Sequence, residues 1–224
     1  MLIEELSYYS DSSYYFEKIK HLEWPVFLDS CYQKDKPQSK YAHFDIVAAN
    51  PFIKIRAKNG VTSVADRDGH YQYKQASLEV LSDLMDQYPK PSSSLPFVGG
   101  AIGYCSYELN LQTAKKNTID TMMMGIYDWA VIVDHFEKKT HIVSMLLDSK
   151  TEAFIAELVV MLDEAKTNLA QDFKIKNSVS DNLSFIEYKR KFDKVMNYIN
   201  AGDCYQINLS KKFEVNTEGD SWNL

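Results

Sequence analysis

The feature that most constrains this chain is a change of apolar period near its C-terminal end. Ser184 and Glu187 form a capping box, in which the hydroxyl and the carboxylate each satisfy a free backbone N–H at a helix start. The apolar residues that follow recur every three or four positions until Gly202, a residue suited to a left-handed helix stop. Beyond this glycine, apolar and polar residues alternate. The sequence therefore predicts a helix over 185–201 and a strand over 204–215.

The rest of the chain is predicted to consist of strands, tight turns and three further helices. Asn59-Gly60 and Asp68-Gly69 lie between strand-forming residues, as in hairpins. A short helix is expected to begin near Ser12 or Ser13. The other expected helices lie at 76–88 and 150–168, and the expected strands lie at 24–28, 44–49, 52–57, 130–134 and 141–147.

Composition limits the classes of protein to consider. The chain has 224 residues, of which 45% are hydrophobic, enough for a substantial core. It carries a net charge of -6 and no basic stripe with interleaved aromatics, so no nucleic acid partner is predicted. No apolar run is as long as a membrane span, and no signal peptide pattern opens the chain. We expect a cytoplasmic protein without a membrane partner, whose three widely spaced cysteines are reduced and buried.

Residues 172–182 are polar and have no clear period, and they directly precede the capping box. A domain boundary is predicted there. The expected organisation is an N-terminal domain over 1–171, a linker over 172–183 and the start of a second domain over 184–224.

Four segments resemble one enzyme family. Residues 201–213, which read Ala-Gly-Asp-Cys-Tyr-Gln-Ile-Asn-Leu-Ser-Lys-Lys-Phe, resemble the opening of the catalytic domain in chorismate-utilising enzymes. These include aminodeoxychorismate, anthranilate, isochorismate and salicylate synthases. Residues 41–49, 96–107 and 125–135 are similar to segments of the aminodeoxychorismate synthase component I group of this family. The resemblance covers essentially the whole chain, in the family's order.

The resemblance implies a fold and an activity. The expected fold is α+β, an antiparallel two-sheet sandwich with flanking helices like that of anthranilate synthase component I. The intact protein is expected to convert chorismate and ammonia into 4-amino-4-deoxychorismate, for 4-aminobenzoate and folate. A glutamine amidotransferase subunit would supply the ammonia, and magnesium would be the cofactor.

The resemblance also implies that the catalytic residues lie outside this chain. In the family a Pro-Ile-Lys-Gly-Thr segment, acidic magnesium ligands and a Gly-Ala-Pro-Lys segment lie in a later half, and neither string occurs here. We therefore expect no catalytic and no metal-binding residue in these 224 residues. Leu224 is expected to be a truncation point, and the fragment is expected to be inactive.

A ligand pocket is predicted where two strands place polar atoms at the edge of an apolar sandwich. In anthranilate synthases a Leu-Glu-Ser segment is part of an inhibitory tryptophan site, and it is similar to Leu28-Asp29-Ser30 here, with aspartate replacing glutamate. A strand-end capping role for Ser30 is the alternative. The expected pocket residues are Leu28, Ser30, Tyr41, His43, Phe44 and Asp45.

Two other patterns are interpreted as structural. Residues 99–103 read Gly-Gly-Ala-Ile-Gly, which matches no phosphate-binding motif, so glycines that let a strand bend are favoured. Asp128 and Asp134 could divide acid and base work, but a solvated strand edge or a buried hydrogen-bonding role for Asp128 is favoured. The five histidines have no spacing suited to a metal.

Two alternative functions stay open. The first is a fragment of anthranilate synthase component I, which more often has Phe-Gln-Val-Val where this chain has Tyr205-Gln-Ile-Asn-Leu. The second, from a different class, is a non-catalytic module that binds tryptophan.

Overall fold

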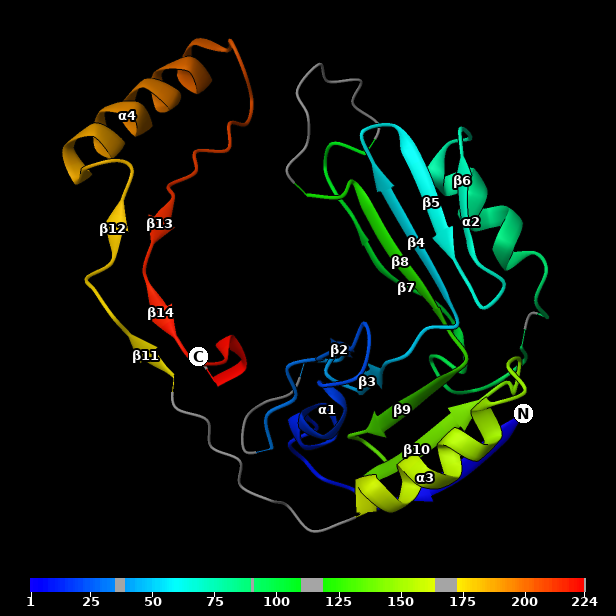
Figure 1. Cartoon of the computed structure of the whole chain (residues 1–224). Coiled ribbons are helices and arrows are strands. Elements are labelled where there is room, and N and C mark those ends of the chain that lie inside the picture. Colours follow the sequence, from blue (N-terminus) through cyan, green and yellow to red (C-terminus); the bar gives the residue numbers. More distant parts are fainter. Residues whose placement is uncertain (35–38, 90, 110–118, 164–172, 224) are drawn as a thin grey trace. The chain divides into compact units, whose positions relative to one another are not determined.

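A computed structural model describes residues 1–34, 39–89, 91–109, 119–163 and 173–223 (Figure 1). The chain divides into two compact units, Met1–Lys166 and Thr167–Leu224. The predicted end of the first domain at residue 171 falls outside the described residues. Each unit is described by itself.

The first unit contains two antiparallel five-stranded sheets (Figure 1). The first sheet has the order β1 (Leu2–Leu6), β10 (Lys139–Ser144), β9 (Trp129–Asp134), β3 (Phe44–Ala48) and β2 (Val26–Leu28). The second has the order β6 (His70–Tyr73), β5 (Val61–Ala65), β4 (Ile53–Lys58), β8 (Met122–Tyr127) and β7 (Gly100–Cys105). Only Asp128 separates β8 of the second sheet from β9 of the first, so these two strands run almost directly from one sheet into the other. The predicted α+β fold with two antiparallel sheets is confirmed.

Helices cover one face of each sheet. The apolar faces of α1 (Ser13–Ile19) and α3 (Thr151–Asp163) share a core cluster with Val47, Val131 and Val133 of the first sheet. The helix α2 (Ser77–Met85) packs through Val80 on alternate residues of β4, such as Ile55. A third cluster contains residues of both sheets, including Ile132 of β9 and Ile102 of β7. Along β4 the period of two places the apolar residues on the covered face. Residues 129–133 of β9 are apolar and buried on both faces.

The predicted turns are confirmed. Lys58 pairs with Val61 in the β4–β5 ladder, which leaves Asn59 and Gly60 as a two-residue loop with φ of 51° and 77°. Positive φ at both positions defines the hairpin turn that Asn-Gly favours. Ala65 pairs with His70 around the second predicted turn.

The glycines of 99–103 have a backbone role, although what they allow is close strand approach and not the predicted bend. Gly99 and Gly100 adopt φ of 143° and 140°, a region that side chains disfavour. A Cβ at Gly103 would collide with the backbone oxygen of Met123 in the paired strand β8. Glycine is therefore needed for β7 to approach β8.

The second unit contains the predicted capped helix, α4 (Phe185–Ala201). The backbone N–H of Glu187 donates to Ser184 Oγ at 3.3 Å, and the backbone N–H of Ser184 donates to Glu187 Oε2 at 3.0 Å. Gly202 ends the helix with φ of 80°. No residue of α4 is buried.

The predicted long strand over 204–215 is wrong. Only β13 (Phe213–Glu214) forms there and pairs with β12 (Ser180–Asp181), while β14 (Thr217–Glu218) pairs with β11 (Lys174–Ile175). A strand needs a hydrogen-bonded neighbour as well as alternation, and no ladder reaches residues 205–212 in the described part of the chain. Two short strands thus lie within the predicted linker, and the unit ends at the 3-10 helix η1 (Ser221–Asn223).

The prediction of buried cysteines is also wrong. Cys31 and Cys105 are exposed, and Cys204 is partly buried. Cys31 lies in the loop after β2, and Cys105 ends β7, which is an edge strand, so neither position is covered by a neighbouring element. Separately, none of the described helices is long and apolar enough to span a membrane.

Candidate functional site

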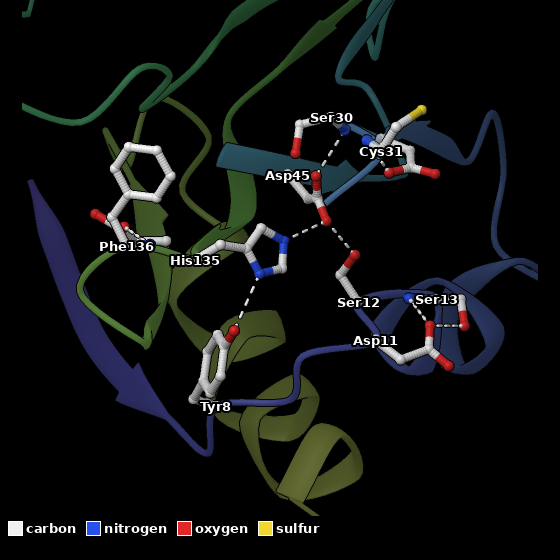
Figure 2. A network of polar contacts seen from close by, with 11 residues as sticks. Tyr8, Asp11, Ser12, Ser13, Ser30, Cys31, Asp45, His135 and Phe136 are labelled. Atoms are coloured by element: carbon white, nitrogen blue, oxygen red, sulfur yellow. Dashed lines mark hydrogen bonds and ion pairs between the residues drawn. The ribbon is translucent and has the colours of Figure 1, made fainter. Parts of the chain in front are cut away.

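A buried carboxylate, Asp45 of β3, lies at the centre of a polar network in the first unit (Figure 2). It is 2% exposed and lies on the strand face that α1 and α3 cover, because Val47 two residues on belongs to their cluster. Its Oδ1 accepts a hydrogen bond from the backbone N–H of Ser30 at 2.7 Å. Its Oδ2 accepts one from Ser12 Oγ and contacts His135 Nε2 at 2.7 Å. One carboxylate therefore joins three segments distant in sequence.

His135 extends this network to the N-terminal segment. Its Nδ1 lies 3.1 Å from the hydroxyl of Tyr8 (Figure 2). Its ring stacks on that of Tyr32, with centroids 4.1 Å apart. The backbone N–H of His135 donates to the backbone oxygen of His43 at 2.9 Å. This bond holds the start of the β9–β10 turn next to the residue that precedes β3. The imidazole is fully buried, with both ring nitrogens engaged.

Opposing effects set the charge state of the network. Burial raises the pKa of Asp45, but hydrogen bonds from Ser12, His135 and Ser30 outweigh it and hold the pKa below the ordinary value of 3.8. Burial raises the pKa of Tyr8, as do the neighbouring Tyr32 and Asp45. Asp45 is therefore ionised and Tyr8 protonated at neutral pH.

This arrangement does not fit nucleophilic or metal chemistry. An activated serine needs a hydrogen bond to a base such as histidine, whereas Ser12 Oγ donates to the carboxylate and His135 contacts Tyr8 and Asp45. Among the described residues, no group of three His, Cys, Asp or Glu side chains could hold a metal ion. The network can hold segments together and fix their polar atoms.

Four of the six predicted pocket residues fall into two groups on opposite faces of the first sheet. Ser30 and Asp45 meet in the buried network. Leu28 is 46% exposed and pairs with Ile46, so it shares the other face with Phe44.

The remaining two lie outside the buried network. His43 Nε2 lies 3.1 Å from Asp134 Oδ1, and its ring stacks between Phe44 and Phe136, with centroids 3.7 and 4.2 Å apart. Tyr41 is 77% exposed.

Sequence reasoning missed Tyr8, Ser12, Tyr32 and His135 as members of this network. Ser12 was expected to cap α1, yet its side chain makes no cap hydrogen bond and reaches Asp45 instead. His135 follows a buried strand directly, which is the one local sign of a buried position. Its partner Asp45 is 90 residues away and becomes apparent only from the β3–β9 pairing.

The buried hydrogen-bonding role expected of Asp128 is confirmed. Asp128 is buried and accepts from the backbone N–H groups of Leu147 and Asp148, both at 2.9 Å. Burial raises its pKa despite these donors. Asp134 accepts from the backbone N–H groups of Phe136 and Glu137, both at 2.9 Å. Asp128 thus holds the segment that follows β10, and Asp134 organises the turn between β9 and β10.

The comparisons with known proteins agree on one enzyme family. Residues 28–224 match the family of chorismate binding enzymes. Aminodeoxychorismate synthase component 1 of Escherichia coli (strain K12) is 32% identical over 221 residues, which cover 94% of this chain and 46% of that protein. Anthranilate synthase component 1 of Bacillus subtilis (strain 168) is 26% identical over 225 residues, covering 83% and 42%.

A solved structure supports the same fold. The crystal structure of anthranilate synthase component I from Streptococcus pneumoniae TIGR4 matches with a TM-score of 0.64 and 22% identity, covering 86% of this chain and 46% of that one. This chain thus spans less than half the length of these relatives. Because the family match extends over most of its residues, the chain belongs to the chorismate-binding enzyme family.

Proposed function

We propose that this chain is the N-terminal portion of an aminodeoxychorismate synthase component I. The observation that carries the proposal is the 32% identity to the E. coli aminodeoxychorismate synthase component over 94% of the chain. The B. subtilis anthranilate synthase component reaches 26% over 83%. The segment Tyr205-Gln-Ile-Asn-Leu209 also favours this group over anthranilate synthase.

In this proposal the intact protein works in the cytoplasm on chorismate and ammonia, and a glutamine amidotransferase subunit supplies the ammonia. The product is 4-amino-4-deoxychorismate, a precursor of 4-aminobenzoate and folate. Magnesium prefers carboxylate oxygens and waters. The described residues contain no group of three His, Cys, Asp or Glu side chains that could hold such an ion. The proposal assigns the magnesium ligands to the family's later half, as the resemblance implies.

The isolated chain is expected not to consume chorismate, because the family's lysine and magnesium-binding segments are absent from its sequence. The measurement is the loss of chorismate with ammonia and magnesium, with the complete E. coli relative as a positive control. Turnover that rises with the concentration of purified chain would contradict the proposal.

A tryptophan site around Ser30 is the second candidate function. The observation that favours it is the buried Oγ of Ser30, which makes no hydrogen bond of ordinary geometry with a described residue, although it lies near enough to Asp45 to help lower the pKa of that carboxyl. A buried polar atom without a hydrogen-bond partner lowers the stability of the folded state. Ligand binding would supply the partner.

We expect calorimetry at millimolar tryptophan to show saturable heat that Ser30→Ala removes. Ser92→Ala, at an exposed position of the same unit, should leave the heat unchanged. No heat from a chain with a folded circular dichroism spectrum would count against the site.

A further inference from the structure

The loop after β2 is held to the first sheet by two buried side chains. The backbone N–H of Ser30 donates to Asp45 Oδ1 at 2.7 Å. Two residues further on, the ring of Tyr32 lies parallel to the buried imidazole of His135, with 2° between the ring planes. Residues 29–32, the β2 loop, are therefore tied both to β3 and to the residue that follows β9.

Cys31 lies between these two contacts in a strained conformation. Its φ is 60°, in the left-handed region that is unfavourable for a residue with a side chain. Its backbone N–H donates to Asp29 Oδ1 at 2.7 Å. Backbone strain of this kind persists only where the surrounding contacts enforce it. We therefore expect the β2 loop to relax once either of its outer contacts is lost.

The N-terminal segment over residues 7–12, the N-terminal strap, contacts the same two buried side chains. In Figure 2, Tyr8 and Ser12 approach them from the side opposite the β2 loop. The hydroxyl of Tyr8 lies 3.1 Å from His135 Nδ1, and Ser12 Oγ donates to Asp45 Oδ2. The strap and the β2 loop thus depend on one carboxylate and one imidazole.

The strap is itself anchored to the helices of the first unit. Ser7 Oγ donates to Asp163 Oδ1 at the end of α3, at 3.2 Å, and the hydroxyl of Tyr15 on α1 donates to the backbone oxygen of Ser7. The strap also lies close to the loop, because Tyr32 helps burial to raise the pKa of the Tyr8 hydroxyl. A fixed segment therefore adjoins a strained one.

We propose that the N-terminal strap controls the opening of the β2 loop: the strap in place holds the loop in its strained conformation, and release of the strap opens it. Opening brings water to Asp45 and His135, and hydration of these polar groups offsets part of the lost contacts. Such a local opening costs less than global unfolding. Access to Ser30 is then under the control of the strap. The inference needs no ligand and no chorismate chemistry, so its failure is distinct from that of the proposed function.

Hydrogen exchange of the full chain tests the proposal, followed by mass spectrometry of peptides that contain the β2 loop. The Ser30 N–H reports opening, because it is protected while Asp45 accepts it. Tyr8→Phe keeps the ring and removes the hydroxyl contact with His135. We expect exchange in the loop to become about fivefold faster, the effect of one hydrogen bond.

Three comparisons separate this coupling from a general loss of stability. Tyr9→Phe removes a hydroxyl from the next residue, whose ring packs on Tyr14, and should leave exchange in the loop unchanged. Tyr32→Leu removes the loop's own stacking on His135. Adding Tyr8→Phe to it should give little further acceleration, since both changes act through the same imidazole. The amides of β4 should exchange as in the parent. No acceleration in Tyr8→Phe, equal acceleration in β4, or effects that multiply in the double variant would overturn the inference.

Discussion

Replacing Asp45 with alanine is expected to lower the free energy of unfolding of the first unit by about 3–5 kcal/mol, because each buried donor left without its acceptor costs about 1–3 kcal/mol. The change removes the acceptor for Ser12 Oγ and for the backbone N–H of Ser30, and it leaves the buried His135 without its partner. Urea unfolding of the full chain measures the loss, followed by the fluorescence of the buried Trp129.

Asp68→Ala is the matched control. Asp68 is exposed in the β5–β6 turn, and substitution of such a surface residue should change the stability by no more than about 0.5 kcal/mol. A loss of only about 0.5 kcal/mol in Asp45→Ala as well would show that the network does not hold the first unit together.

The same carboxylate predicts a pH dependence. The pKa of Asp45 lies below its ordinary value of 3.8, so the folded state binds protons there less readily than the unfolded state. The stability that its ionised form contributes is present above pH 3.8 and is lost as the pH falls through the folded pKa. Asp45→Asn removes this contribution, so the stability difference between it and the parent should shrink below pH 3.8. A constant difference across this range would contradict the assignment.

Deleting residues 184–224 is expected to convert a self-associating chain into a soluble monomer. In this segment large apolar side chains are exposed, among them Phe185 at 76%, Ile186 at 80% and Tyr205 at 94%. Exposed apolar surface of this extent recruits other chains. Sedimentation velocity of the full chain and of residues 1–183 measures the effect.

Point variants separate the apolar surface from the deletion itself. Phe185→Lys combined with Ile186→Lys should shift the full chain towards monomer, because both positions are exposed on α4. Lys189→Gln, on the same helix, should leave association unchanged. A clean monomer for the full chain, with no gain on deletion, would mean that the apolar residues of this segment are already covered.

The sequence predicted features that depend on neighbouring residues. The capping box at Ser184, the stop at Gly202 and the Asn59-Gly60 hairpin all follow from backbone requirements within a few positions. The two sheets were predicted from the period of the strands and from the family resemblance.

Features that depend on distant partners were not predictable. Alternation over 204–215 predicts which way side chains point, but it does not predict whether a neighbouring strand is present to pair with. Only Phe213 and Glu214 pair with another strand. Likewise, the hydroxyl of Ser12 could satisfy a helix start or a buried carboxylate, and only the tertiary fold brings Asp45 to it. The two faces of β3 also separate pocket residues that are adjacent in sequence, such as Phe44 and Asp45.

The most direct test of the proposed function is the product formed from chorismate by the intact protein of the proposal. With ammonia and magnesium, we expect 4-amino-4-deoxychorismate, detected as 4-aminobenzoate after treatment with the lyase that acts on it. Formation of anthranilate, detected by its fluorescence, would contradict the account and assign the chain to the anthranilate synthases.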